Sequence, residues 1–345
     1  MTRPVFILGA SRSGTTMLRL MLNAHPSVAV PGEQNYFDAL PTPMPDWRAP
    51  GWSPRRYEAF VDAYLDRKLA TLPGLDRAAI RPVILAPDQP RTLRAPYQLT
   101  LDAWAHGQGK PRWGEKTPNN FFYVDLIYEM FPEARFLHIV RDPRAVVYSM
   151  NRFARCGDDT VLNAANWREF IDRGARLLES SVPADQRLTI TYEALTADPA
   201  GHAKTICAFL GEPFLPAMLD FYKTADTYMH PVYRTIGGDK TVTRPVTDRS
   251  ARPKWVEGLT TDQVAIVESV CAEGMRRYGY EPTGARASLG ARLDQTWKLA
   301  YVAAKRRQHA ADRFHLVNYR PFGRLRRNPD PAPPDRSSQP ASHPR

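Results

Sequence analysis

The sequence has little cysteine and no long hydrophobic run. Its 345 residues include three cysteines, Cys156, Cys207 and Cys271, whose wide spacing matches neither a metal-binding motif nor a disulfide framework. Such sparse use is typical of a reducing compartment. No apolar stretch approaches the roughly 20 residues that a membrane-spanning helix needs, and the apolar stretch at residues 5–8 is too short for a signal peptide. We therefore expect a cytoplasmic protein, and no metal is implied.

The main part of the chain also lacks a strong net charge. Residues 284–345 carry 13 lysines and arginines against 4 acidic residues, a net charge of +9, whereas the rest of the chain carries 34 against 32. The total of +11 therefore describes a basic tail rather than a basic body. A basic tail alone is weak evidence for nucleic-acid binding, and we expect no nucleic-acid partner.

What the sequence does contain is FILGASRSGTT, residues 6–16. A short β-rich run ends in Gly9, and a helix-forming run opens at Thr15, so the segment predicts a strand, a loop and a helix. Two glycines separated by four residues let backbone N–H groups surround an anion at the helix N-terminus. Arg12 adds a permanent charge, and Thr15 and Thr16 add hydroxyl donors.

The loop lacks the lysine of an ATP-binding loop. The Walker pattern places lysine directly after the second glycine, and Thr15 stands there in this chain. The absence argues against a kinase or NTPase, which remains one alternative. A tight strand-to-helix turn that binds no ligand is another.

The remaining patterns favour an α/β fold. Residues 135–140 and 187–192 are predicted strands. Residues 143–153, 200–211 and 260–280 are predicted helices, the last with Thr260 or Thr261 as N-cap.

We divide the chain into three parts. Residues 1–282 form the predicted catalytic domain, with a helical and proline-rich cap inserted at 41–111. Residues 283–320 form a basic amphipathic helical extension, and residues 321–345 a proline- and serine-rich tail that we expect to be disordered.

The segment GASRSGTTMLRLMLNAHP resembles the 5′-phosphosulfate loop of sulfotransferases that use 3′-phosphoadenosine 5′-phosphosulfate (PAPS). It is most similar to the tyrosylprotein sulfotransferase-like branch with its bacterial relatives, although Ser11 replaces that branch's usual proline. The resemblance extends over most of residues 4–282 in separated blocks. It implies a P-loop-type three-layer sandwich with a mostly parallel sheet. It also implies PAPS as co-substrate without a metal, and Ser13 and Gly14 as further contacts of the donor.

A second block, HIVRDPRAVVYSM, resembles the family's 3′-phosphate motif. Arg141 and Ser149 occupy its two anchoring positions, eight residues apart. Two alternatives for this block are a magnesium-binding carboxylate at Asp142 and a surface ion pair involving Arg141 or Arg144.

The resemblance also implies a base and a cation. Glu33 lies 21 residues after Arg12, the spacing of the branch's catalytic glutamate, although the register can shift by one residue. Lys116 resembles the lysine that faces the phosphosulfate, so it would stabilise the transition state together with Arg12. His25 is a rival base, although its place before a proline at the helix end favours capping or packing there. Glu115 is a salt-bridge partner or a second carboxylate in the site. A solvated side chain is the alternative for both Glu33 and Lys116.

Three further residues are expected near the nucleotide. Tyr192 resembles the tyrosine of the family's Tyr-Glu-x-Leu segment at a strand end. Lys254 belongs to a Lys-Trp pair that the family shares, and Arg249 lies in a glycine- and arginine-rich loop that we expect to close over the donor.

The acceptor is less constrained. A peptide acceptor is not implied, because the chain lacks the membrane anchor of the tyrosylprotein enzymes. The candidate acceptors are hydroxyl groups of a lipid, a glycolipid, a small metabolite or a tyrosyl residue. Trp47, Trp52 and Tyr57 either line an acceptor pocket or form the core of the cap. The basic helix at 291–317 either lies peripherally on the inner membrane or is a solvated or domain-packing helix.

Overall fold

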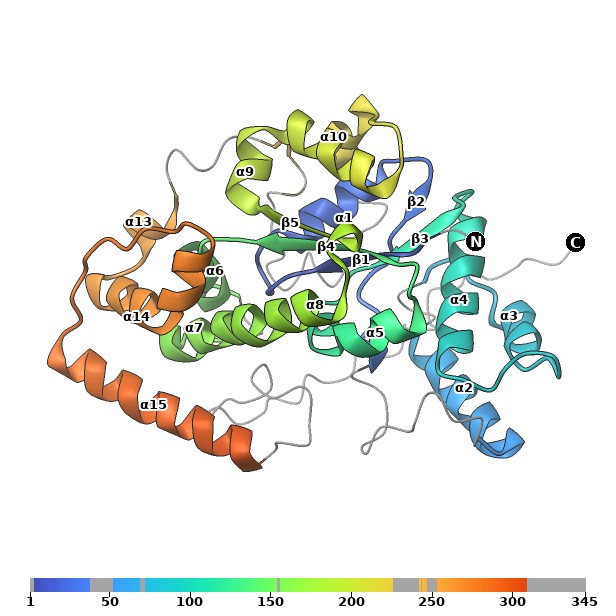
Figure 1. Cartoon of the computed structure of the whole chain (residues 1–345), viewed down its shortest axis with the longest axis horizontal. Coiled ribbons are helices and arrows are strands. Elements are labelled where there is room, and N and C mark those ends of the chain that lie inside the picture. The colour runs from blue at the N-terminus through green and yellow to red at the C-terminus, as the bar shows by residue number, and fades with distance from the viewer. Residues whose placement is uncertain are drawn as a thin grey trace, which may run out of the picture.

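A five-stranded parallel sheet lies at the centre of the structure (Figure 1). The computed structural model describes residues 3–37, 52–68, 72–153, 156–225, 242, 244–246 and 253–308. In these residues the strand order is β2-β3-β1-β4-β5, and every neighbouring pair is parallel. The strands are β1 (Val5–Leu8), β2 (Val28–Ala29), β3 (Arg112–Glu115), β4 (Arg135–Val140) and β5 (Arg187–Thr191).

Apolar side chains on both faces of the strands account for this arrangement. Phe6 and Leu8 enter one hydrophobic cluster and Val5 and Ile7 enter another on the opposite face, and all four are 0% exposed. β1 is buried along its whole length, as expected of a continuous apolar run, whereas β5 lies at the sheet edge and leaves Thr189 exposed. The predicted strands at 5–8, 135–140 and 187–192 are confirmed, except that Tyr192 already begins a helix.

Helices cover both faces of the sheet. In Figure 1, α9 and α10 lie on one face, α5, α7 and α8 lie on the other, and α2 to α4 gather at one end. The predicted α/β sandwich is confirmed. The helices are α1 (Thr15–Asn23), α2 (Pro54–Lys68), α3 (Arg77–Ile84), α4 (Arg94–Gly107), η3 (Pro118–Tyr123), α5 (Val124–Met130), α6 (Pro143–Asn151), α7 (Thr160–Glu169), η4 (Phe170–Ala175), α8 (Arg176–Ser181), η5 (Ala184–Gln186), α9 (Tyr192–Ala197), α10 (Pro199–Leu210), η6 (Pro216–Lys223), α13 (Trp255–Gly258), α14 (Thr261–Arg277) and α15 (Leu289–Gln308).

The cap is joined to the sheet by an aromatic core. Trp52 and Tyr57 are buried, and Trp52 packs 5.1 Å from the ring of Phe60. Tyr36 stacks on Tyr97 of α4 with ring centroids 4.4 Å apart, in the same cluster. Trp52 and Tyr57 are therefore core residues of the cap and not the lining of an open acceptor pocket, whereas Trp47 lies outside the described residues.

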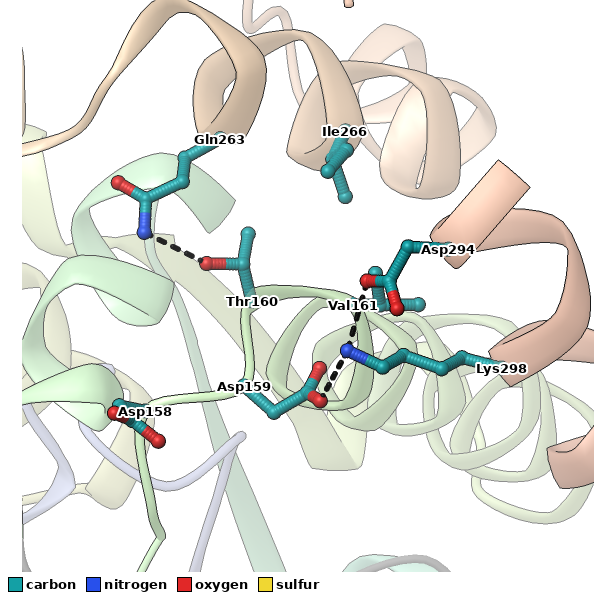
Figure 2. Close-up of a pocket in the computed structure, with 8 residues that line it drawn as sticks. All are labelled: Asp158, Asp159, Thr160, Val161, Gln263, Ile266, Asp294 and Lys298. Carbon is teal, nitrogen blue, oxygen red and sulfur yellow. Dashed lines mark hydrogen bonds and ion pairs between the residues drawn. The ribbon is translucent and has the colours of Figure 1, made fainter. Parts of the chain in front are cut away.

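The basic extension begins as a helix packed on the domain. α15 covers the described part of the predicted 291–317 helix; residues 309–345, with the predicted tail, lie outside the described residues. Lys298 bonds Asp159, the N-cap of α7, at 2.6 Å and Asp294 at 2.8 Å, beside a cavity of about 350 Å³ (Figure 2). Within the described residues, no helix combines the length and the apolar character that a membrane crossing needs.

A buried ion-pair network holds the C-terminal helices to the sheet edge. Arg144 of α6 is 5% exposed and bonds Asp142 at 2.8 Å, Glu268 of α14 at 2.8 Å and the carbonyl oxygen of Glu281 at 3.0 Å. Its guanidinium also lies over the ring of Trp255, 4.3 Å from the centroid.

Replacing the arginine in Arg144→Met should lower the free energy of unfolding by about 3–5 kcal/mol, because two buried carboxylates lose their counter-charge. Denaturant titration followed by circular dichroism measures the change. The matched control is Arg176→Met, which breaks an exposed pair with Glu273 and should cost less than about 1 kcal/mol. Equal losses in the two variants would contradict the role assigned to this network.

Candidate active site

Five parts of the predicted site follow the carboxyl ends of strands. The glycine loop follows β1, Glu33 follows β2, Lys116 follows β3, Arg141 follows β4 and Tyr192 follows β5. Because the five strands are parallel, these segments emerge at one edge of the sheet. Ligands of open α/β sheets bind in the crevice at this edge, where the strand order reverses. The reversal here lies beside β1, between β3 and β4.

The loop after β1 presents unsatisfied donors. α1 starts at an N-cap, Gly14, that provides no side-chain bond, and the first turn contains no acidic residue. By contrast, Asp142 caps α6 and Asp198 caps α10. The hydroxyl of Ser13 is buried without a partner in the described part of the chain. A helix N-terminus with free N–H groups and a buried free hydroxyl fits an anion such as a phosphate.

Arg12 and Arg141 form a cationic group beside this loop. Arg12 Nε donates to Ser149 Oγ at 3.0 Å, and Arg141 Nη1 donates to the carbonyl oxygen of Arg12 at 3.1 Å. The guanidinium of Arg141 lies 4.2 Å from the ring centroid of Tyr192, and its Nε is buried without a partner among the described residues. The structure therefore brings together four predicted residues from three separate segments.

The two alternatives for the second block have different outcomes. Asp142 accepts from the backbone N–H of Arg144 at 2.8 Å and from the guanidinium of Arg144, and so it both caps α6 and pairs within the network described above. A carboxylate used in this way is poorly suited to a magnesium ion. The ion pair predicted for Arg144 is present, with Asp142 and Glu268, but it is buried and not on the surface.

Glu33 and Lys116 meet in an ion pair. Lys116 Nζ donates to Glu33 Oε1, and the lysine side chain is 4% exposed whereas that of Glu33 is 28% exposed. The neighbouring Gln34 instead turns its amide to the carbonyl oxygen of Gly32, at 2.8 Å. In this structure Glu33 is therefore the partner of the lysine, and neither Glu33 nor Lys116 is merely solvated.

Behind this pair lies a carboxylate whose surroundings sequence reasoning missed. Glu115 is 0% exposed and accepts hydrogen bonds from Thr117, Gln34 and Asn120. Burial raises the pKa of Glu115 to about 7, and the hydrogen bonds and the charge of Lys116 oppose the rise. Glu115 is thus a second carboxylate beside the pair, buried and bound by hydrogen-bond donors. The sequence offers one weak sign of this arrangement, the threonine two positions after the glutamate. Hydrophobic periodicity does not reveal it, because the contacts join residues of different segments.

The remaining predicted residues have different outcomes. His25 is 2% exposed; its Nδ1 accepts from the N–H of Ser27 at 3.1 Å and its Nε2 donates to the carbonyl oxygen of Pro213 at 3.0 Å. It therefore packs at the end of α1, as its alternative role predicted. Lys254 is exposed at the N-terminus of α13, and within the described residues its side chain makes no capping bond to that helix. Arg249 lies outside the described residues.

The comparisons with known proteins agree on one family. A model described as "Sulfotransferase family" matches residues 4–216. The protein-tyrosine sulfotransferase of Drosophila melanogaster is 26% identical over 288 residues, which are 81% of this chain and 52% of that protein. Protein-tyrosine sulfotransferase A of Caenorhabditis elegans is 26% identical over 294 residues, 83% of this chain and 69% of that protein. The chain thus spans about half the length of the first relative and about two thirds of the second.

A solved structure supports the fold. The sulfotransferase domain of the Synechococcus PCC 7002 olefin synthase superposes with a TM-score of 0.50 at 23% identity, covering 78% of this chain and 95% of that chain.

The contact between Gly14 and Tyr192 leads to a prediction. Gly14 has φ +101°, and a Cβ built there would lie 2.5 Å from Tyr192 Cδ2. Gly14→Ala should therefore lower the free energy of unfolding by about 2–4 kcal/mol, from backbone strain and the clash together. The matched control is Gly109→Ala, at φ +70° with open space around the Cβ, which should cost about 1 kcal/mol. Thermal unfolding measures both, and equal losses would show that the ring of Tyr192 does not press on the loop.

Proposed function

Because the chain belongs to the sulfotransferase family, we propose that it transfers a sulfuryl group from PAPS to an acceptor hydroxyl and releases adenosine 3′,5′-bisphosphate. The observation that carries the proposal is the pair of anion-binding groups on either side of β1. One is the uncapped loop with Arg12, Arg141 and Ser149, and the other is the ion pair of Lys116 with Glu33.

The residues present fit the donor. Ser13 Oγ and Arg141 Nε are buried donors without partners among the described residues, which is the state expected of groups that bind an anionic ligand. Residues Ser13 to Thr16 would hold the 5′-phosphosulfate, and Arg141 with Ser149 would hold the 3′-phosphate. Arg12 lies against Ser149, and so it would connect these two anion sites rather than serve the sulfuryl group alone.

Glu33 would receive the proton of the acceptor hydroxyl. The acceptor oxygen forms the new bond to sulfur while the bond from sulfur to the phosphate oxygen breaks, and the electron pair of that bond leaves with the bisphosphate. Lys116 would donate hydrogen bonds where negative charge increases. The contact between Glu33 and Lys116 supports this assignment, because a hydroxyl that reaches the carboxylate is then beside the ammonium.

Several classes of acceptor are compatible with the proposed reaction. The relatives above are named for protein tyrosine, and a tyrosyl hydroxyl is therefore one candidate. Hydroxyl groups of lipids, glycolipids and small metabolites are the others.

Binding and transfer can be tested separately. Adenosine 3′,5′-bisphosphate at about 100 times its dissociation constant should stabilise the protein by about 2.7 kcal/mol, and Arg141→Met should abolish the shift in melting temperature. Glu33→Gln should keep the shift but lower kcat by about 10²–10⁴-fold, because the base is lost. Transfer is followed as bisphosphate release with a panel of tyrosyl peptides and hydroxylated lipids.

The control for Arg141→Met is Arg187→Met. Arg187 begins β5 at the opposite edge of the sheet and donates to the carbonyl oxygen of Val182. Stabilisation by ATP but not by the bisphosphate would contradict the proposal. Bisphosphate binding with no transfer to any acceptor would favour a non-catalytic nucleotide-binding protein.

We also propose that α15 contacts an anionic membrane surface. Leu289, Leu293 and Trp297 are 71%, 63% and 43% exposed and follow one another at helical spacing on one side of α15. The exposed Arg292 and Arg307 flank this stripe, whereas Lys298 and Arg306 pair with residues of the domain. An apolar stripe with tryptophan and arginine suits the interface of an anionic bilayer.

Vesicle cosedimentation tests this contact. The full chain should bind phosphatidylcholine vesicles that contain about one third phosphatidylserine, and replacing Leu289, Leu293 and Trp297 by serine should weaken binding by about tenfold or more. The control is Val256→Ser, which removes a 56% exposed valine from α13. Unchanged binding by the triple variant, or a change in oligomeric state without a change in vesicle binding, would overturn the proposal.

A further inference from the structure

Glu115 is a buried carboxylate that the proposed transfer step does not use. It is the last residue of β3, directly before Lys116, and it is 0% exposed. A carboxylate buried at this depth is costly unless hydrogen-bond donors surround it. The groups that surround it therefore show what the residue does.

Four donors converge on Glu115. Its Oε1 accepts from Thr117 Oγ1 at 2.6 Å and from the backbone N–H of Gln34 at 3.3 Å. Its Oε2 accepts from the backbone N–H of Thr117 at 3.1 Å and from Asn120 Nδ2. Three of the donors belong to the turn that follows β3, and the fourth belongs to the segment that carries Glu33.

Thr117 makes the second connection to that segment. Its Oγ1 accepts from the backbone N–H of Gln34 at 3.0 Å and from that of Asn35 at 3.1 Å. Asn35 has φ +46°, a conformation that non-glycine residues adopt only when their surroundings hold them. Glu115 and Thr117 thus bind both backbone amides that follow Glu33.

The chain beyond these amides is also fixed. Tyr36 and Phe37 are each 2% exposed and lie in the aromatic core, where Tyr36 Oη donates to the carbonyl oxygen of Leu93 at 2.6 Å. The pair Glu115 and Thr117 is therefore the attachment nearest to Glu33 on its C-terminal side, and these two residues directly flank Lys116 at the end of β3.

We infer that Glu115 and Thr117 are positioning residues that fix the backbone after Glu33, so that its carboxylate stays against Lys116. The two side chains of the pair come from different segments, and this hydrogen-bonded tether joins their backbones. The kinetic consequence rests on the proposed function. The tether itself is a property of the protein without substrates and can be tested apart from it.

Two shape-matched variants break the tether at different atoms. Glu115→Gln places an NH₂ donor where the carboxylate accepted, so the N–H of Gln34 and the other three donors cannot all be satisfied. Thr117→Val removes the hydroxyl, and Thr117→Ser keeps it. Hydrogen–deuterium exchange of the protein without substrates should show the amides of Gln34 and Asn35 exchanging about tenfold faster or more in Glu115→Gln and Thr117→Val, with Thr117→Ser close to the wild type.

The kinetic test separates positioning from donor binding. The same two variants should lower kcat by about 10- to 100-fold, because small misplacements of a catalytic group are expensive. The bisphosphate concentration that gives half of the maximal melting-temperature shift should stay within about twofold of wild type, and Thr117→Ser should restore kcat.

The control for a general loss of stability is Glu268→Gln. Glu268 is a buried carboxylate of α14 that accepts from Arg144 and from the N–H of Thr283. This variant should lose stability but keep wild-type exchange at residues 33–37 and wild-type kcat. Unchanged exchange in Glu115→Gln, or identical behaviour of Thr117→Ser and Thr117→Val, would overturn the inference. Faster exchange in a protein whose wild type transfers nothing would support the tether and reject the proposed reaction.

Discussion

The parallel hydrogen bonding of β1 to β3 on one side and to β4 on the other determines where the site can form. Phe6 pairs with Glu115 across one ladder and with Phe136 across the other. This register carries the loop after β1 to the same edge as the residues after β3 and β4. The arginine group of Arg12 and Arg141 and the ion pair of Lys116 with Glu33 therefore lie on either side of one central strand, although more than 100 residues of sequence separate some of their members. The apolar side chains on both faces of β1 hold this arrangement together.

The two groups handle their charge differently. Among the described residues, Arg12 and Arg141 bond or stack on neutral groups: a hydroxyl, a carbonyl oxygen and the faces of Phe153 and Tyr192. The charge of Arg141 also acts on the nearby carboxylate of Glu193, which accepts its hydrogen bonds from Asp142 and Tyr280 instead. The N–H groups of Arg141 can therefore still donate to a ligand. The more deeply buried Lys116 is neutralised by Glu33. The two arginines suit a polyanionic donor. The ion pair suits a reaction in which Glu33 takes up a proton while Lys116 stabilises negative charge beside it.

Much of this site could be predicted from the sequence, and the parts that could not have identifiable causes. The loop at 9–16 and the block around Arg141 follow strongly apolar strands, so local patterns locate them. β2 and β3 give no comparable signal, because β2 has two residues and β3 includes Arg112 and Gly114. Glu33 and Lys116 follow these two strands, and the resemblance to the family identified both residues instead. Their contact with each other is seen only in the structure. The direction of Arg12 toward Ser149 depends on its positive φ of 71°, which residue type does not reveal.

In the proposed reaction, the pairing of Glu33 with Lys116 explains why the proposed base needs a backbone tether. An ammonium has three N–H donors, so Lys116 can keep Glu33 while it donates to oxygens that gain charge during transfer. The ion pair alone would not hold the carboxylate in one place, because Glu33 is partly exposed and its side chain can rotate into solvent. The hydrogen bonds from the backbone N–H groups of Gln34 and Asn35 to Thr117 and Glu115 fix the backbone next to Glu33 before any substrate binds. Only the side-chain rotation of Glu33 is then left free. Since Glu115 ends β3 and Lys116 directly follows it, movement of that strand end would shift the cation and the proposed base together and preserve their contact.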